Sequence, residues 1–402
     1  MIVGFPASKF GQGPCFGRLQ ATAAVLGLDW SLMASRSVLI VGSNGKGTTA
    51  AMTAAGLTTR GRTGLFTSPH LMSVTERIAI NGTPIALDAL EALSLEVAAA
   101  RTQARVAEQA MGSFEHLFLI AALAFERAGC AHIVWEAGIG GRLDPTRLVR
   151  TRIGALTSLD LEHTALLGET LTAIGQDKLD GFAPGAEVLV GPSAAPVWPD
   201  LSAYAALTDK TLTAPLAEEA TPFQGLEADF LSINASLAWG IARRLIGDDP
   251  EALAAIAGAR LPGRLETVAL NPLAIVDIGH TPDAARHALA GFRRAAPEGG
   301  ALLVGVSPGK KAQEILSVLA PAFPRIACVQ ARFSGRPSEE IAALAREAAP
   351  GAEITAHDGV QDAWGALREE GRTIFAAGSL YVAAEVKALA CGLDPAALAF
   401  LD

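Results

Sequence analysis

The feature that most constrains the fold is a short apolar run that stops abruptly at a glycine-rich loop. Residues 37–41 are Ser-Val-Leu-Ile-Val, and the loop Gly42-Ser-Asn-Gly-Lys-Gly-Thr-Thr49 follows directly. The β-branched run predicts a strand, and the alanine-rich stretch after Thr49 predicts a helix. Strand, glycine loop and helix in this order are typical of a nucleotide-binding unit, so we expect an α/β fold.

Further short apolar runs alternate with helical segments along the whole chain. Strands are expected at 131–135, 153–159, 187–190, 275–277, 301–304, 326–329 and 373–376, and helices over 114–127 and 229–261. This alternation indicates parallel sheets covered on both faces. A break at Pro262-Gly-Arg264 divides the chain into a first domain, 1–263, and a second, 264–402. The Ala-, Pro- and Thr-rich tract 194–219 is expected to form surface excursions.

Composition excludes several classes of protein. Half of the 402 residues are hydrophobic and 18% are charged, which is enough for a large core. The net charge of −9 argues against a nucleic-acid partner, because such binding depends on a basic face. Four scattered cysteines without a C-x-x-C pair fit a reducing compartment. With no signal-like N-terminus and no long apolar run, we expect a cytoplasmic chain without membrane contact.

The loop from Gly42 to Thr49 has the chemistry of a phosphate cradle. Small residues let backbone N–H groups approach phosphate oxygens, Lys46 would neutralise phosphate charge, and Thr48 would hold Mg²⁺. The loop is shorter than the usual G-x-x-x-x-G-K-[ST] motif, which disfavours a generic P-loop NTPase or kinase. A plain turn is the simpler interpretation, but a lysine between two glycines, followed by two threonines, is unusual for one.

Polar side chains at strand ends mark a second set of candidates. Glu136, His163 and Asp277 each follow a predicted strand, where parallel sheets form the crevice that binds ligands. A carboxylate at such a place suits Mg²⁺. Taken singly, the plainer interpretations hold: an ion-paired glutamate, a structural histidine, a turn at Asp277 and His280, and a solvated Lys178. The glycines from 138 to 141 have the wrong spacing for a dinucleotide fingerprint, so NAD is not expected.

The motifs together resemble the folylpolyglutamate synthase/dihydrofolate synthase family of the Mur ligase superfamily. The order and spacing of the motifs match that family over nearly the whole chain. The matching segments are Gly42–Thr49, Thr67-Ser-Pro-His-Leu71, Thr75-Glu-Arg-Ile78, Phe114-Glu115, Glu136-Ala-Gly-Ile-Gly-Gly-Arg-Leu-Asp144, His163-Thr164, Leu167-Gly168, Asp177-Lys178, Pro262-Gly-Arg264, Asp277 and Gly378-Ser-Leu380.

The resemblance implies a Mur-ligase-like fold: a P-loop ATPase domain with a parallel-type central sheet, followed by a smaller Rossmann-like domain. It implies an ATP- and Mg²⁺-dependent ligase that phosphorylates a carboxylate and couples the acyl phosphate to an amine, with a folate-type acid and L-glutamate as substrates. Such a transfer needs a cleft that excludes water. A monomer acting in one-carbon metabolism is expected.

The resemblance also implies a role for each matched residue. ATP would contact Asn44, Gly45, Lys46, Gly47, Thr48, Asn234, Arg264 and Asp277. Magnesium would be held by Thr48, Ser68, Glu136 and His163. Lys46, His163, Lys178 and His280 would serve catalysis, Lys178 as a carbamylated lysine and His280 beside the incoming amino acid. The acceptor would contact Phe114, Glu115, Leu143, Asp144, Pro145 and Arg147.

Departures from the family pattern fall mainly on the acceptor and amino-acid sides. Leu143-Asp-Pro-Thr-Arg147 stands where the family has Leu-Asp-Ala-Thr-Asn, and Cys15-Phe-Gly-Arg18 where it has Gly-Leu-Glu-Arg. Glu162 replaces an aspartate, and Ser307-Pro-Gly-Lys-Lys311 replaces an Asp-Lys-Asp loop. Two alternatives therefore stay open: a paralogous ligase with another acceptor or amino acid, and a nucleotide-binding subunit without catalysis.

Overall fold

The first lobe is built on an eight-stranded, mostly parallel sheet in the computed structural model, which describes residues 5, 6, 8, 11–13, 15–215, 217–224 and 229–400. The strand order is β4-β3-β2-β5-β1-β6-β7-β8, and only β3 and β4 run antiparallel to their neighbours. The strands are β1 (Ser37–Val41), β2 (Thr63–Phe66), β3 (Ile78–Ile80), β4 (Thr83–Pro84), β5 (His132–Glu136), β6 (Ile153–Leu156), β7 (Ala186–Val190) and β8 (Lys210–Thr213).

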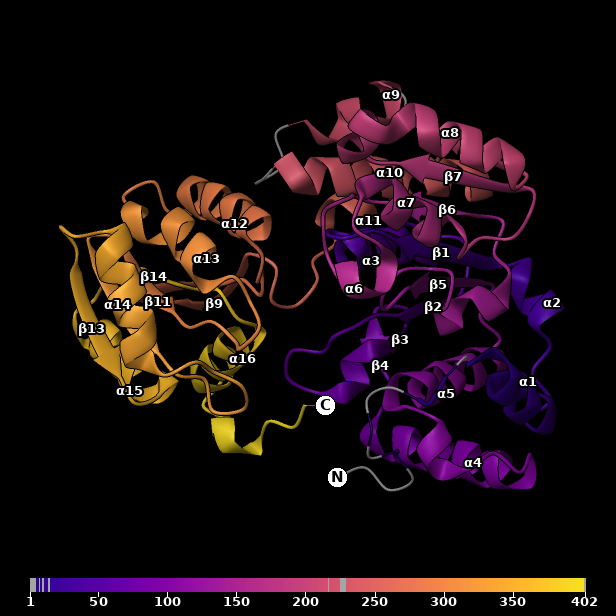
Figure 1. Cartoon of the computed structure of the whole chain (residues 1–402), viewed down its shortest axis with the longest axis horizontal. Helices are drawn as coiled ribbons and strands as arrows, with labels where there is room; N and C mark the ends of the chain where they lie inside the picture. The colour runs from indigo at the N-terminus through magenta and orange to yellow at the C-terminus, as the bar shows by residue number, and fades with distance from the viewer. Residues whose placement is uncertain are drawn as a thin grey trace.

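Helices cover both faces of this sheet (Figure 1). Helix α3, which follows the glycine loop, packs against α10 and α11 on one face, and α5 lies between β2 and α4 on the other. The helices are α1 (Phe16–Val25), α2 (Trp30–Ala34), α3 (Lys46–Thr58), α4 (Leu87–Gln103), α5 (Ser113–Arg127), α6 (Thr164–Leu167), α7 (Leu171–Leu179), α8 (Trp198–Leu207), α9 (Ala217–Ala220), α10 (Asp229–Ile246) and α11 (Pro250–Gly258).

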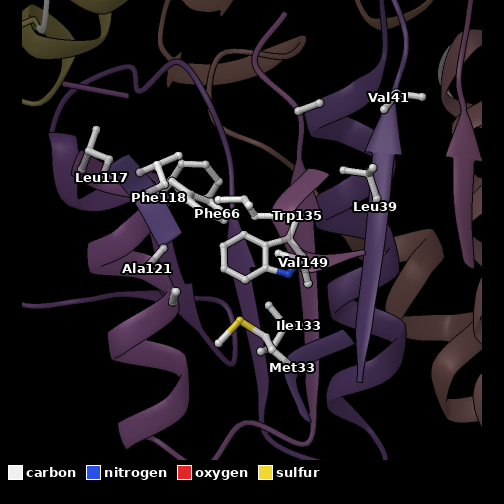
Figure 2. Packing of buried hydrophobic residues seen from close by; sticks show 14 of the residues in the cluster. Met33, Leu39, Val41, Phe66, Leu117, Phe118, Ala121, Ile133, Trp135 and Val149 are labelled. Carbon is white, nitrogen blue, oxygen red and sulfur yellow. The ribbon is translucent and has the colours of Figure 1, made fainter. Parts of the chain in front are cut away.

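An aromatic cluster fills the core between the sheet and α5. Trp135 of β5 lies against Phe66 of β2, with ring centroids 5.9 Å apart, and against Phe118 of α5 at 5.2 Å (Figure 2). The indole nitrogen of Trp135 donates to Ser37 Oγ at 3.0 Å, which satisfies a polar atom that would otherwise be buried unpaired. Strand β1 is buried along its whole length, so the loop that follows it starts from a fixed point.

The second lobe has its own sheet and its own cores. Its strand order is β13-β12-β11-β14-β10-β9, parallel except for β9. Its strands are β9 (Glu266–Leu270), β10 (Leu273–Val276), β11 (Ala301–Val304), β12 (Arg325–Val329), β13 (Glu353–His357) and β14 (Ile374–Ala377). Its helices are α12 (Pro282–Ala295), α13 (Ala312–Leu319), α14 (Ser338–Ala348), α15 (Val360–Glu369) and α16 (Leu380–Ala390).

The α/β expectation is confirmed, and one segment has more regular structure than was expected. The tract 194–219 is not merely surface loop: it contains α8 and the edge strand β8. Leu201 and Ala205 are buried on one face of α8, while Ala203 and Ala206 are exposed. The second sheet starts three residues after the predicted boundary at 263, and the division into two domains there stays a prediction. Among the described residues, no helix is both long enough and apolar enough to cross a membrane.

Candidate active site at the ends of the central strands

The glycine loop leaves β1 at the carboxyl edge of the sheet and is held by the segment after the neighbouring strand β6. The backbone N–H of Ser43 donates to Ser158 O at 2.9 Å, and that of Asn44 to Ser158 Oγ at 2.8 Å. Thr157 Oγ1 donates to Asn44 O at 2.7 Å. Gly45 adopts a left-handed conformation, φ +83°, immediately before α3 begins. The loop is therefore preformed at the N-terminus of a helix, a place that favours anions.

Lys46 is at the electrostatic centre of the site. Its ammonium donates to Gly42 O at 2.9 Å and Ser43 O at 3.2 Å, so it folds back over the loop. Its positive charge acts to lower the pKa of several titratable groups around it, whatever the net shift of each group. These groups are Glu136, Glu162, His163, Lys178 and His280. The structure thus brings together the predicted catalytic residues, which lie up to 234 positions apart in sequence (280 − 46 = 234).

Glu136 is buried beside the first turn of α3. Its Oε2 accepts the backbone N–H of Ser68 at 2.9 Å. A Cβ at Gly47 would lie 3.3 Å from the same oxygen, so the carboxylate lies against the start of the helix. Burial raises the pKa of Glu136, against the opposing charges of Lys46, Arg264 and Arg77. A buried carboxylate can offer oxygen ligands to a hard cation such as Mg²⁺.

Lys178 is almost fully buried and forms an ion pair that sequence reasoning missed. Its Nζ lies 2.9 Å from Glu162 Oε1 and 2.9 Å from Gly42 O. Burial and the nearby Lys46 lower the pKa of Lys178. The pKa of Glu162 is also lowered, because the two lysine charges outweigh its own burial. The interpretation of Lys178 as a solvated surface lysine is therefore wrong.

The second lobe contributes Asp277 and His280 to the same edge. Asp277 is buried at the end of β10, and its carboxylate accepts the N–H groups of Gly279 at 2.7 Å and Leu265 at 3.1 Å. Burial raises the pKa of Asp277, with Arg264 acting in the opposite direction. Burial lowers the pKa of His280 to about 4, and Lys310 adds to that effect. Burial, helped by Lys310, also lowers the pKa of His163.

Asn234 provides a direct test of whether a nucleotide fits. It comes from α10, and its Oδ1 accepts from Thr49 Oγ1 at 3.2 Å. A Cβ at Gly45 would lie only 2.6 Å from this oxygen. Its Nδ2 is buried and has no hydrogen-bond partner among the described residues. Because an unpaired buried donor costs about 1–3 kcal/mol, this atom beside a phosphate-type loop fits a ligand that accepts a hydrogen bond.

A divalent cation also fits, with ligands shared between the protein and a phosphate. Within the described ranges, no three His, Cys, Asp or Glu side chains gather as a ready-made metal site. Mg²⁺, however, is usually held by one or two carboxylates together with waters and substrate phosphates. Glu136 with the hydroxyls of Thr48 and Ser68 is such a donor set. Ser68, Glu136 and Arg264 also line one cavity of about 510 Å³ that runs along α3.

The two predicted acceptor segments lie side by side on the other face of the sheet. Cys15 Sγ donates to Leu143 O at 3.5 Å, the Arg147 guanidinium lies 5.7 Å from the Phe16 ring centre, and Arg18 forms two 2.6 Å bonds to Glu115. Burial raises the pKa of Cys15 to about 12, so this thiol is protonated and inert.

The predicted acceptor-binding residues differ in exposure and in the hydrogen bonds that they already form. The Phe114 ring is half-buried beside Gly138, while the Arg147 and Leu143 side chains are exposed and Pro145 is buried. Asp144 already accepts four hydrogen bonds, from the N–H groups of Gly138, Ile139 and Thr146 and from Thr146 Oγ1. Its role in this structure is to hold its own loop, and substrate contact by Asp144 stays a prediction.

Some residues of the site could not be selected from the sequence. Thr157 and Ser158 brace the glycine loop, and Lys310 reaches the two histidines from the second lobe. The first two lie at the carboxyl end of the predicted strand 153–159 and follow the observed strand β6 directly, which is a usable signal. The effect of Lys310 on the histidines depends on how the two lobes are placed relative to each other. No local sequence pattern predicts that placement.

The comparisons with known proteins find similarity to a ligase domain and to synthases that contain it. A model of the Mur ligase glutamate ligase domain matches residues 263–380. A probable bifunctional folylpolyglutamate synthase/dihydropteroate synthase of Halobacterium salinarum is 34% identical over 61% of this chain, which covers only 33% of that longer protein. Mycobacterium tuberculosis folylpolyglutamate synthase, solved with ADP and AMPPCP, superposes with a TM-score of 0.82 at 26% identity, covering 94% of this chain and 95% of the other.

A second similar structure was solved with a metal. The bifunctional folylpolyglutamate synthase/dihydrofolate synthase of Yersinia pestis, with AMPPNP and a manganese ion, superposes with a TM-score of 0.78 at 25% identity, over 96% of this chain and 94% of the other. A phosphate-type loop on a parallel sheet, completed by a glutamate ligase domain, is the architecture of the Mur ligases. The chain carries a Mur ligase glutamate ligase domain over residues 263–380 and is similar over most of its length to folylpolyglutamate synthases and dihydrofolate synthases.

Proposed function

We propose that this protein is an ATP- and Mg²⁺-dependent ligase that joins L-glutamate to the carboxylate of a folate-type acceptor. The observation that carries the proposal is the convergence around Lys46 of a preformed anion loop, a buried carboxylate and two histidines from different lobes. The nucleotides and manganese bound by the two structural relatives support the same reaction class. ATP would supply the phosphoryl group that turns a poor electrophile into a reactive acyl phosphate.

The residues of this chain divide the work as follows. Lys46, released from Gly42 O and Ser43 O, meets phosphate oxygens that replace those carbonyls. Glu136, with Thr48 and Ser68, holds the divalent cation that screens phosphate charge. Asn234 and Asp277 hold the nucleoside from opposite lobes. His280 is neutral at physiological pH because its pKa is about 4, so an amine arriving beside it meets no imidazolium charge.

Lys178 is the candidate for carbamylation, as the family resemblance implies. A lysine reacts with CO₂ only as the neutral amine, and burial next to Lys46 lowers the pKa of Lys178 in that direction. Labelling with ¹³C-bicarbonate should give one carbamate NMR signal that is absent from Lys178→Ala. A folded wild-type protein without the signal would leave Lys178 as a plain ion-pair partner of Glu162.

The direct test measures both turnover and binding. Phosphate release and product mass are followed with ATP, Mg²⁺ and L-glutamate against dihydropteroate, tetrahydrofolate and non-pterin acids. Binding of the two pterins is measured with a non-hydrolysable ATP analogue present. A glutamylated pterin product is expected. If ATP binds but neither pterin binds below millimolar concentration, about −4 kcal/mol, the acceptor assignment is wrong while the nucleotide site stands.

One observation favours a shifted acceptor preference as the second candidate. Arg147 replaces a family asparagine and, lying over Phe16, forms one surface with the other altered segment. An arginine there adds a charge and a planar donor fork. In Arg147→Asn, an acceptor preference restored toward dihydropteroate would identify this residue as the determinant. We also propose that the protein works as a cytoplasmic monomer, in keeping with four free cysteines, three of them buried.

A further inference from the structure

The loop between β2 and β3, residues 67–77, is held by both lobes at once. On the side of the first lobe, its Ser68 N–H is bonded to Glu136. On the side of the second lobe, Leu71 is buried in the same apolar cluster as Val276 and Ile278 of the region around β10. The loop also closes on itself, because the Glu76 carboxylate accepts the N–H groups of Leu71, Met72 and Ser73. The loop is therefore a compact body between the lobes.

At the centre of this loop, both ring nitrogens of His70 form hydrogen bonds, so the ring links two other segments as a hydrogen-bonding relay. Arg77 Nε donates to His70 Nδ1 at 2.9 Å, so Nδ1 must carry a lone pair. The proton then sits on Nε2, which lies 2.9 Å from Ala399 O and donates to it. The side chain is 2% exposed, so water does not compete for either bond. The geometry fixes one tautomer and one ring orientation.

The partner of His70 is the segment after α16, which crosses from the second lobe toward the first (Figure 1). The Phe400 ring is stacked on the His70 ring, with centroids 5.6 Å apart and planes at 3°. Phe400 is itself held edge-on by Tyr381 of α16, at 4.8 Å, and packs against Phe333 at 5.1 Å. An aromatic cluster of the second lobe thus carries the ring that covers His70.

The relay ends beside the candidate metal site. Arg77 is buried, its charge acts on Glu136, and its carbonyl accepts the N–H of Thr67 at 3.0 Å, next to Ser68. A change at Phe400 would therefore reach Ser68 and Glu136 through His70 and Arg77. Partners that orient metal ligands typically change metal affinity by 10- to 100-fold when removed.

We propose that His70, held by Ala399 and Phe400, is a positioning residue of the metal site and makes that site depend on docking of the segment 398–400. The proposal rests on the proposed function, because it assumes that Ser68 and Glu136 bind the divalent cation. It assigns to this segment a role in the reaction that acts through His70 and Arg77.

The test measures metal binding independently of turnover. Mn²⁺ binding is followed by electron paramagnetic resonance with a non-hydrolysable ATP analogue, in wild type, Phe400→Ala, Phe400→Tyr and Leu393→Ala. Leu393 is exposed in the chain between α16 and residues 398–400 and serves as the matched control. Phe400→Ala is expected to raise the Mn²⁺ Kd about tenfold, while Phe400→Tyr, which keeps the ring, and Leu393→Ala stay within about twofold.

A second variant at the other end of the relay guards against simple loss of folding. His70→Ala should weaken Mn²⁺ binding at least as much as Phe400→Ala, and the double variant should be no weaker than His70→Ala alone, because both act on one path. Additive losses, or a folded Phe400→Ala that matches Leu393→Ala, would overturn the inference alone. A wild type that binds no Mn²⁺ with the nucleotide analogue would overturn the proposed function and the inference with it.

Discussion

Lys46 holds its ammonium against the carbonyls of its own loop until a better acceptor arrives. In Lys46→Ala, we expect amide formation to fall by several kcal/mol of transition-state stabilisation, on the order of hundreds-fold or more. The fold should persist, because α3 is anchored by α10 and α11. The measurement is phosphate release together with the thermal midpoint. Lys210→Ala, away from the glycine loop, is the matched control, and near wild-type turnover in a folded Lys46→Ala would refute the assignment.

Glu136 should show opposite effects on metal binding and on stability. Burial raises its pKa, so above the ordinary value of 4.5 its charge opposes folding. Glu136→Gln should therefore raise the thermal midpoint of the ligand-free protein at pH 7, by an amount that shrinks as the pH falls toward 4.5.

The same variant should need more Mg²⁺ for half-maximal rate, because an amide lacks the charge that a hard cation prefers. Glu298→Gln, on the surface, should change neither quantity. An unchanged Mg²⁺ requirement in Glu136→Gln would remove Glu136 from the ligand set, whatever happens to the thermal midpoint.

At the scale of elements, the glycine loop and α10 fit each other so closely that only glycine is tolerated at position 45. Gly45→Ala would place a methyl group 2.6 Å from Asn234 Oδ1 in a left-handed backbone conformation. We expect nucleotide affinity to fall at least tenfold. Gly129→Ala has a similar φ, +61°, with nothing within 4 Å of the added carbon, and therefore isolates the backbone cost of about 1–2 kcal/mol.

If the clash is the cause, Asn234→Ala should relieve part of the stability loss of Gly45→Ala without restoring nucleotide binding. Equal stability losses in Gly45→Ala and Gly129→Ala would show instead that backbone strain alone explains the effect.

Most interior strands were predicted from the sequence, whereas the edge strands, and also the interior strands β2 and β3, were missed. Runs such as 37–41 and 301–304 coincide with β1 and β11 because strands buried on both faces are continuously apolar. Strands β8 and β13, by contrast, lie at sheet edges and carry Lys210 and Glu353. Edge strands keep polar residues, so their alternation is weak. Prediction of the site is limited in the same way. The glycine loop is a contiguous sequence motif and can be found locally, whereas the Lys178–Glu162 pair and the effect of Lys310 depend on tertiary structure.

At the scale of the whole molecule, the candidate nucleotide site draws on both lobes. Asn234 comes from the first and Asp277 from the second, so nucleotide with Mg²⁺ should stabilise the two together. At 100 times Kd, the gain is about 2.7 kcal/mol, and calorimetry should show the lobes unfolding in one ligand-dependent transition.

In Asp277→Asn, we expect the two lobes no longer to unfold in one shared transition. The unfolding temperature of the first lobe should still rise when the nucleotide is added. Loss of ligand stabilisation in both lobes would mean that Asp277 controls nucleotide binding as such. A ligand-dependent transition that is unchanged in Asp277→Asn would exclude a contact between Asp277 and the nucleotide.

Strand β1 lies between β5 and β6 in the middle of the first sheet, and these three strands deliver the glycine loop, Glu136 and the brace at Thr157. Backbone amides in such a position exchange with solvent only when the whole sheet opens. The amides that anchor the catalytic edge should therefore be among the slowest to exchange. On gradual heating, selectivity among acceptors would therefore change before nucleotide binding is lost.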